Sequence, residues 1–147
     1  MYMYIAVWKL CLRPSKNLKK LGKWAVVTGG SDGIGLAYAE ALAAKKMSVC
    51  LVARNKDKLE KCVSDIKSKF KVDATYIVAD MPLTEELKKH LAKSLADLGE
   101  IGVLINNVGV SYDHAEYLHE LDDARIKLLI QINIEATTAI TKMVLPG

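Results

Sequence analysis

The feature that most restricts the fold of this chain is an alternation of short, continuously apolar segments with longer segments of helical periodicity. The apolar segments have the length and β-branched content of strands buried on both faces, and they are 25–27, 48–53, 74–79 and 102–105. Apolar residues recur at helical spacing in 34–47, 56–70, 84–98 and 123–145. Short connections between such elements favour right-handed crossovers and parallel strands. The sequence therefore predicts a doubly wound α/β domain, with a parallel sheet covered by helices on both faces.

The size and composition of the chain limit it to one folded domain. It has 147 residues and a mass of 16.2 kDa, with 51% apolar residues, 26% charged residues, three prolines and nine glycines. The length excludes a two-domain protein, and the composition excludes a disordered or fibrous one. We divide the chain into a leader, residues 1–20, and a folded portion, residues 21–147.

Positive charge is concentrated at the N-terminus. Residues 1–23 carry six basic residues and no acidic one, whereas the remainder has 15 basic and 17 acidic residues. A nucleic-acid-binding domain keeps a basic face on its folded body, so we expect no nucleic-acid partner. The first twelve residues are apolar except for Lys9, which is too short a run to cross a bilayer by itself. We expect the leader to associate with a membrane, as the end of a longer anchor or as an interfacial helix, with a secretory signal or a disordered start as alternatives.

The cysteines and histidines indicate neither a disulfide framework nor a metal site. The three cysteines are Cys11, Cys50 and Cys62. They form no C-x-x-C pair, and two of them fall in segments expected to face the core. A reducing compartment is the expectation. The histidines lack metal-ligand spacing with the cysteines and with one another, so we expect surface positions and no metal; they are His90, His114 and His119.

A glycine-rich turn joins the first predicted strand to the first predicted helix. Gly29 permits a tight exit from the strand, Gly33 lets a diphosphate approach the backbone, and Gly35 lets the helix pack closely on the sheet. Amides at a helix start attract phosphate, so we predict that this turn binds a dinucleotide. Its predicted binding residues are Gly29, Ser31, Asp32, Gly33, Ile34 and Gly35. A turn that binds nothing is the alternative.

Two positions distinguish between nucleotides. Leu36 stands where a P-loop requires lysine, which argues against a triphosphate clamp. A site for NAD or for a methyl-donor cofactor needs a carboxylate at the end of the second strand to hold ribose hydroxyls, but this strand ends in Ala53 followed by Arg54. A planar cation without a neighbouring carboxylate suits a 2′-phosphate, so Arg54 predicts NADP(H) as the cofactor. An ordinary exposed arginine is the alternative.

Further polar residues follow the later strands or lie inside the last helix. Asp80 follows the third strand, where its carboxylate would accept an adenine amino proton or begin a turn. Asn107 and Gly109 follow the fourth strand, where a ligand of this fold lies, with a simple loop start as the alternative. Asn133 stands between two isoleucines, although asparagine is a poorer helix former than alanine by roughly 0.5 kcal/mol. We expect it to be solvent-exposed or to make a polar contact beside a buried site.

Together these motifs resemble the short-chain dehydrogenase/reductase family. The matching pieces are Thr28-Gly-x-x-x-Gly-x-Gly35, Asp80, Asn106-Asn-x-Gly109 and Asn133. The segment Trp24–Gly29 and the closing Leu145–Gly147 are similar to the branch of hydroxysteroid dehydrogenases and very-long-chain 3-oxoacyl-CoA reductases. The resemblance covers residues 16–147. It implies a Rossmann-type sheet whose first strands are ordered 3-2-1-4.

The resemblance also implies hydride transfer between NADP(H) and a carbonyl or alcohol, with a lipid or steroid as the small-molecule substrate. The family uses an active-site serine, a Tyr-x-x-x-Lys pair and a helix asparagine, and only the asparagine matches, at Asn133. By resemblance, Asn133 is the catalytic residue that this chain contains. None of the six tyrosines has lysine four residues later, so the acid/base is missing.

This departure from the family pattern leads us to expect an incomplete domain, the first four strands and their helices of a longer parent enzyme, without activity of its own. Such a domain leaves Val103, Leu104 and Ile105 as an apolar edge that needs a partner. By resemblance, the parent is expected at the endoplasmic reticulum membrane, with the cytoplasm as the alternative, and it is expected to form homo-oligomers. The competing interpretation is a non-catalytic nucleotide-binding or regulatory protein derived from this family.

Overall fold

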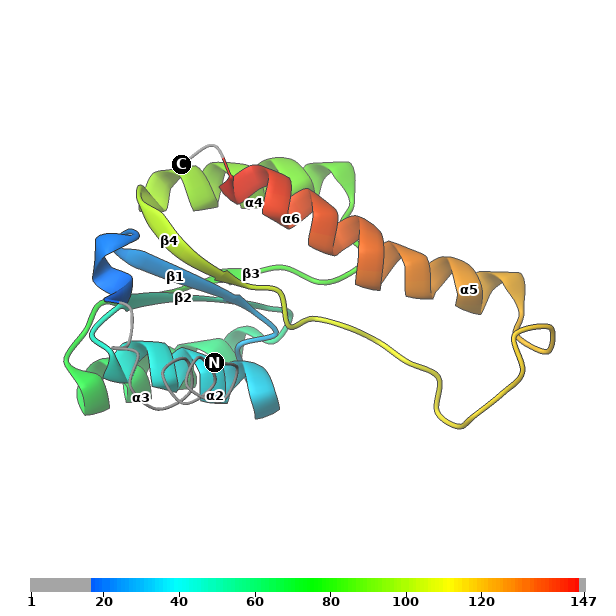
Figure 1. Ribbon diagram of the computed structural model, residues 1–147, viewed down its shortest axis with the longest axis horizontal. Helices are drawn as coiled ribbons and strands as arrows, with labels where there is room; N and C mark the ends of the chain where they lie inside the picture. The colour runs from blue at the N-terminus through cyan, green and yellow to red at the C-terminus, as the bar shows by residue number, and fades with distance from the viewer. Residues whose placement is uncertain (1–16, 146–147) are drawn as a thin grey trace, which may run out of the picture.

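In the computed structural model, which describes residues 17–145, a parallel sheet of four strands lies between two helical layers (Figure 1). The strands are β1 (Trp24–Thr28), β2 (Ser48–Ala53), β3 (Ala74–Val78) and β4 (Ile101–Ile105). Their order is β3-β2-β1-β4, and β1 pairs in parallel with β2 and β4, as β2 does with β3. The prediction of a doubly wound parallel sheet with strand order 3-2-1-4 is confirmed.

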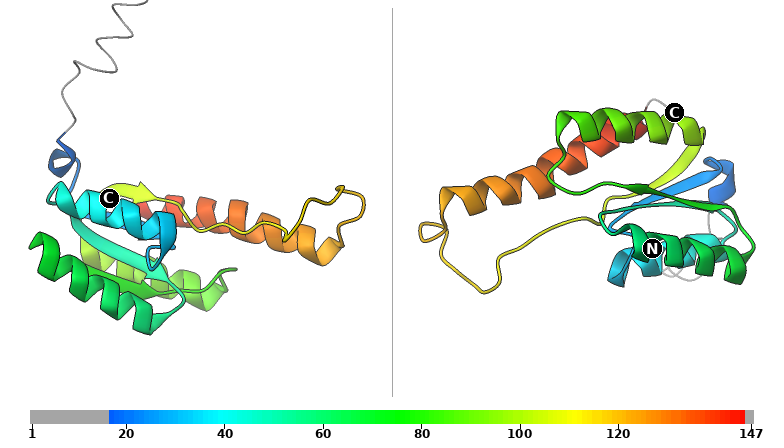
Figure 2. Two further views of the ribbon diagram at one scale, coloured as in Figure 1. Left: turned by 90° about the horizontal axis from the view of Figure 1, so that it is seen from below. Right: turned by 180° about the vertical axis from the view of Figure 1, so that it is seen from behind.

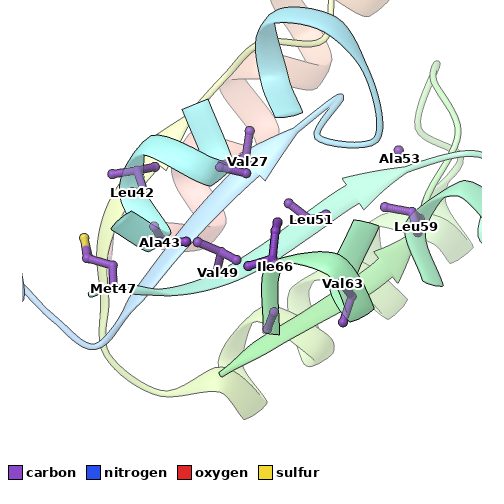
Figure 3. Packing of buried hydrophobic residues seen from close by; sticks show 13 residues of the cluster. Val27, Leu42, Ala43, Met47, Val49, Leu51, Ala53, Leu59, Val63 and Ile66 are labelled. Carbon is purple, nitrogen blue, oxygen red and sulfur yellow. The ribbon is translucent and has the colours of Figure 1, made fainter. Parts of the chain in front are cut away.

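Helices cover both faces of this sheet. α2 (Gly33–Ala44) and α3 (Lys56–Phe70) lie on one face, and α4 (Glu85–Leu98) and α6 (Thr137–Val144) lie on the other (Figures 1 and 2). Successive residues of one strand serve opposite layers, since Val27 packs with α2 and α3 while Val26 packs with α4 and α6. Figure 3 shows the first of these layers, in which Leu42 and Ile66 meet β1 and β2. Burial on both faces is the reason why β1 and β2 read as continuous apolar runs.

The first helix is shorter than its apolar spacing predicts. α2 ends at Ala44, and the predicted extension to Met47 is wrong because the chain turns at Lys46, which has a left-handed φ of 66°. Lys46 N–H donates to Ala43 O at 2.8 Å and Met47 N–H donates to Leu42 O at 3.2 Å, the pairing of a Schellman cap. Met47 is fully buried. Its side chain packs in the core from the turn after the helix rather than from the helix itself.

The other predicted boundaries up to β4 agree with the structure to within one residue. β2 and α3 have the predicted bounds. The Thr84 hydroxyl caps α4 by accepting the Leu87 N–H at 3.2 Å, as its position ahead of two glutamates predicted.

The predicted final helix is divided into three parts. α5 (Asp123–Ile130) and α6 are separated by η3 (Gln131–Ala136), a π-helical segment. Figure 1 shows them as one rod that extends past the end of the sheet and is reached from β4 by a long irregular connection. A prediction of uniform α-helix over 123–145 misses η3 because a π-turn keeps the chain helical while adding a residue to the turn.

β4 forms one edge of the sheet. Among residues 17–145 it pairs with β1 and has no strand on its other side. All five of its residues are half-buried, whereas the whole of β2 is buried. The expected apolar edge at Val103–Ile105 is confirmed for this part of the chain.

Most of the predicted leader lies outside the described residues. Its last part forms a short turn, η2 (Leu18–Lys20), in which the Asn17 side chain accepts the Lys19 N–H. Cys11 and the closing Pro146-Gly147 also lie outside. Within residues 17–145, no helix combines the length and the apolar character needed to cross a membrane.

Candidate functional site

A hollow of about 430 Å³ lies at the carboxyl ends of the strands. Segments that follow β1, β2, β3 and β4 all contribute to its wall. Five residues predicted to bind a cofactor line it, and they are Gly29, Ser31, Arg54, Asp80 and Gly109. Ligands of open α/β sheets bind in this position, beyond the carboxyl ends of parallel strands. Residues separated by up to 80 positions in sequence therefore meet where a nucleotide is expected.

The apolar part of the wall was not among the predicted site residues. It consists of Ala53, Ala79, Met81, Val108, Val110, Leu128 and Ile132. Most of these residues adjoin a predicted polar residue at a strand end, which is the signal that could have identified them. Leu128 and Ile132 are four positions apart and so share one face of the last helices.

The glycine turn has the backbone geometry that its sequence predicts. Gly29 and Gly33 have φ values of 65° and 52°, in the left-handed region that favours glycine. A Cβ on Gly35 would collide with Gly29 O and lie 2.6 Å from Asn107 Nδ2, so this glycine permits close packing of the helix. A Cβ on Gly33 would have no atom within 4 Å, so the backbone there faces open space.

The start of α2 offers amide donors beside the hollow. The first helical bond is from Leu36 N–H to Asp32 O, at 3.2 Å. The amides of Gly33, Ile34 and Gly35 therefore have no acceptor within the helix. Asp32 caps the first of them, because its Oδ1 accepts the Gly33 N–H at 2.8 Å. Backbone amides, a helix dipole and an open Gly33 fit the diphosphate of a dinucleotide.

A hydroxyl buried at the end of β1 fixes the turn relative to β4. Thr28 Oγ1 accepts the N–H groups of Asn107 at 2.9 Å and Val108 at 3.1 Å, and it donates to Ile105 O at 3.4 Å. The Asn107 amide donates in turn to Thr28 O at 3.1 Å and Gly29 O at 3.4 Å. Asn107 thus lies behind the hollow rather than in its wall, and its contacts position the glycine turn.

Arg54 and Asp80 follow neighbouring strands and are both exposed in the wall of the hollow. Ala53 precedes Arg54, so no carboxylate stands at the end of β2. One Asp80 oxygen accepts the Met81 N–H at 2.9 Å, which is the turn-forming role considered for this residue. Recognition of an adenine amino group by Asp80 stays a prediction.

Asn133 holds the loop that follows β4. Its Oδ1 accepts the Val110 N–H and its Nδ2 donates to Val110 O, both at 2.9 Å. Gly109 lies directly beneath it, since a Cβ there would be 3.2 Å from Asn133 Oδ1. Asn133 is exposed, which is the first of the two expectations for it, and its polar contact is with an exposed loop beside the hollow rather than with a buried site.

The glycine turn and the strand-end residues agree with a comparison against known families. Residues 23–147 match the model of the short chain dehydrogenase family. The chain belongs to this family. The chain is 49% identical over 129 residues to a very-long-chain 3-oxoacyl-CoA reductase of Macaca fascicularis. This alignment covers 86% of this short chain dehydrogenase and 41% of the reductase. The chain is also 39% identical over 130 residues to the human inactive hydroxysteroid dehydrogenase-like protein 1, covering 88% of this chain and 39% of that protein.

Solved structures of this family share the fold. L-sorbose reductase of Gluconobacter frateurii, complexed with NADPH and L-sorbose, has a TM-score of 0.77 and 31% identity, over 86% of this chain and 47% of that one. An alcohol dehydrogenase of Thermococcus sibiricus, complexed with 5-hydroxy-NADP, has a TM-score of 0.76 and 31% identity, over 84% and 52%. This chain thus spans roughly two fifths of the curated relatives described above and about half of these solved structures.

Proposed function

We propose that this chain forms the NADP(H)-binding half of a reductase that acts on a lipid-like carbonyl, such as a 3-oxoacyl thioester or a steroid. The observation that carries the proposal is the hollow at the strand ends, which joins the glycine turn to Arg54. The class of oxidoreductase follows from the family, and the lipid-like substrate is supported by the names of the reductase relatives.

The choice of NADP(H) over NAD(H) depends on the end of β2. Arg54 lines the hollow and Ala53 has no carboxylate that would repel a 2′-phosphate. An arginine presents a planar set of donors that matches phosphate oxygens. Relatives of known structure that were complexed with NADPH add support.

When bound, the nicotinamide would supply or accept the hydride. The chain's own residues bind and orient the cofactor: the amides of Ile34 and Gly35, which Asp32 does not cap, receive the diphosphate beside the open backbone of Gly33, and Arg54 receives the 2′-phosphate. Asn133 is in contact with the loop at Val110, on the side of the hollow formed by the last helices. The proton donor would come from a Tyr-x-x-x-Lys pair, which the 147 residues do not include.

A titration of the purified chain with NADPH and NADH, followed by dihydronicotinamide fluorescence, tests the cofactor assignment. We expect tighter binding of NADPH, and we expect Arg54→Asp to weaken NADPH binding by more than about tenfold while NADH binding changes little. Lys93→Asp, an equal charge change at an exposed position of α4, is the matched control. Equal affinity for both nucleotides in the unmodified chain would contradict the assignment.

The location and assembly are proposed for the parent protein: attachment to the endoplasmic reticulum membrane through residues 1–20, with a cytoplasmic location as the alternative, and homo-oligomers. Fractionation of cells expressing the full reading frame, with and without residues 1–20, tests the attachment. Loss of membrane recovery on removal of the leader is the expected result, and unchanged recovery would contradict it.

A second candidate function is a non-catalytic nucleotide-binding or regulatory protein. It is supported by the similarity to a relative described as inactive. The downstream reading frame separates the two functions, because an in-frame serine and Tyr-x-x-x-Lys would support the enzyme. In either case we expect the purified chain to reduce no ketone with NADPH, and measurable turnover would overturn that expectation.

A further inference from the structure

An acidic residue stands inside the turn that is proposed to receive a diphosphate. Asp32 lies between Ser31, which lines the hollow, and Gly33, whose backbone faces open space. Its side chain is 75% exposed, so its charge is not removed by burial. An uncompensated carboxylate in this position would repel every phosphate that approaches α2, and a nucleotide with an additional phosphate most strongly.

One lysine of α3 compensates this carboxylate. Lys58 Nζ lies 2.8 Å from Asp32 Oδ2, a contact across 26 residues of sequence. The ion pair lowers the pKa of Asp32, because the Lys58 ammonium donates to its carboxylate, and it raises the pKa of Lys58 for the reciprocal reason. Both groups are therefore charged at neutral pH.

The backbone of α3 places Lys58 close to Arg54. The Asn55 side chain caps α3 by accepting the Lys58 N–H at 2.9 Å, so Lys58 lies in the first turn, immediately beyond the strand end that carries Arg54. The Arg54 guanidinium is near enough to oppose the rise in the pKa of Lys58. Arg54 and Ser31 line the hollow, and the ion pair of Lys58 and Asp32 lies beside them in sequence, outside its wall.

A second contact shows that α3 holds the same turn at two successive residues. Cys62, one helical turn after Lys58, donates from Sγ to Ser31 O at 3.5 Å. Residues four apart lie on one helix face, so Lys58 and Cys62 present a single surface to Ser31 and Asp32. The helix that carries Lys58 therefore also contacts the turn at Ser31, next to Asp32.

We propose that Lys58 determines cofactor specificity indirectly, by neutralising Asp32 so that the turn accepts the phosphorylated dinucleotide. This inference rests on the proposed NADP(H) site. Asp32 caps α2 through Gly33, and Lys58 offsets the negative charge that this cap brings to the turn. Lys58 is thus a positioning and charge-balancing residue, whereas Arg54 is the direct phosphate ligand.

The test compares three variants of the full chain by titration with NADPH and NADH. Lys58→Met removes the ammonium, Asp32→Asn removes the carboxylate charge but keeps an oxygen for the cap, and the third variant combines both changes. Lys67→Met, in the last turn of α3, removes an equal charge at a distance from the turn and serves as the control. A phosphate monoester carries about two negative charges at neutral pH, so NADPH is more sensitive than NADH to an exposed Asp32.

We expect Lys58→Met to weaken NADPH binding by about fivefold or more and NADH binding by about twofold or less. The double variant should return NADPH binding to within about twofold of the unmodified chain, because no carboxylate is left to neutralise. An unchanged NADPH-to-NADH ratio in Lys58→Met, or a double variant as weak as Lys58→Met, would overturn the proposal; the second result would mean that Lys58 contacts the phosphate directly. If the unmodified chain binds neither nucleotide, the proposed function itself fails and this inference fails with it.

Discussion

Asn133 and Val110 are joined by a pair of reciprocal hydrogen bonds: the asparagine oxygen accepts the Val110 N–H and the asparagine amide donates to the Val110 carbonyl, each at 2.9 Å. This pairing satisfies both backbone groups of a residue that belongs to no strand or helix. It fixes the connection between β4 and α5 at the point where that connection borders the hollow.

Replacing Asn133 with alanine should release this loop. We expect faster hydrogen exchange at the Val110 amide and a loss of about 1 kcal/mol in the free energy of unfolding, because two partly exposed hydrogen bonds are removed. Thr138→Ala, at an exposed position of α6, is the control. Equal protection of Val110 in Asn133→Ala and in the unmodified chain would contradict the role assigned to the asparagine.

Thr28 provides a sharper test of what holds the site together. Thr28 is only 1% exposed and its hydroxyl accepts two backbone N–H groups, so Thr28→Val leaves two partly buried donors without their partner. We expect a destabilisation of about 2–4 kcal/mol in urea unfolding. Thr28→Ser keeps the hydroxyl and should cost only about 1 kcal/mol for the lost methyl group. Similar losses in the two variants would show that packing, and not hydrogen bonding, is the main contribution of Thr28.

Two glycines of the turn should respond differently to alanine. Gly35→Ala brings a methyl group against Gly29 O, so we expect a loss of stability of about 1–3 kcal/mol even though alanine favours helices. Gly33→Ala meets no atom, and its stability cost is limited to about 1 kcal/mol from the left-handed backbone. Because its methyl group would stand where the diphosphate is proposed, NADPH binding should fall more than stability does. Thermal unfolding and nucleotide titration, run in parallel, separate these effects.

The ion pair between Asp32 and Lys58 predicts a pH dependence. The pKa of Asp32 is lowered in the folded chain from its ordinary value of 3.8, chiefly by the hydrogen bond from Lys58. The stabilisation is therefore present above pH 3.8 and is lost as the pH falls through the lower, folded pKa. NMR titration of the side-chain carboxyl carbon of Asp32 should record a higher pKa in Lys58→Met than in the unmodified chain. An identical titration in both would show that the pair does not persist in solution.

The two cysteines of the described region should differ in reactivity. Burial raises the pKa of Cys50 to about 12, and burial also raises the pKa of the partly exposed Cys62. In a Cys11→Ser background, a thiol reagent at pH 8 should therefore modify Cys62 slowly and Cys50 only on unfolding. Mass spectrometry of the modified peptides measures the order. Modification of Cys50 first would show that β2 is more accessible than its burial indicates.

Much of the site was predictable because it depends on local sequence. The positions of Gly29, Arg54, Asp80 and Gly109 each follow from the end of a strand, and the ends of parallel strands converge on one edge of the sheet. Strand and helix types were predictable for the same reason, since a short continuous apolar run or an apolar period of 3.6 can be recognised from consecutive residues. The error at Met47 marks the limit of this method: a buried side chain continues an apolar pattern even after the helix has ended.

The sequence alone thus determined the order of elements, the glycine turn and the absence of a carboxylate at the end of β2. Only the tertiary structure decided that Asn107 braces the turn instead of lining the hollow, that Asn133 binds Val110, and that Lys58 pairs with Asp32. These contacts join residues from 23 to 79 positions apart. No sequence periodicity predicts them, because they depend on how helices and loops pack on the folded sheet. The sequence around an asparagine or a lysine is the same whether its side chain contacts water or another residue.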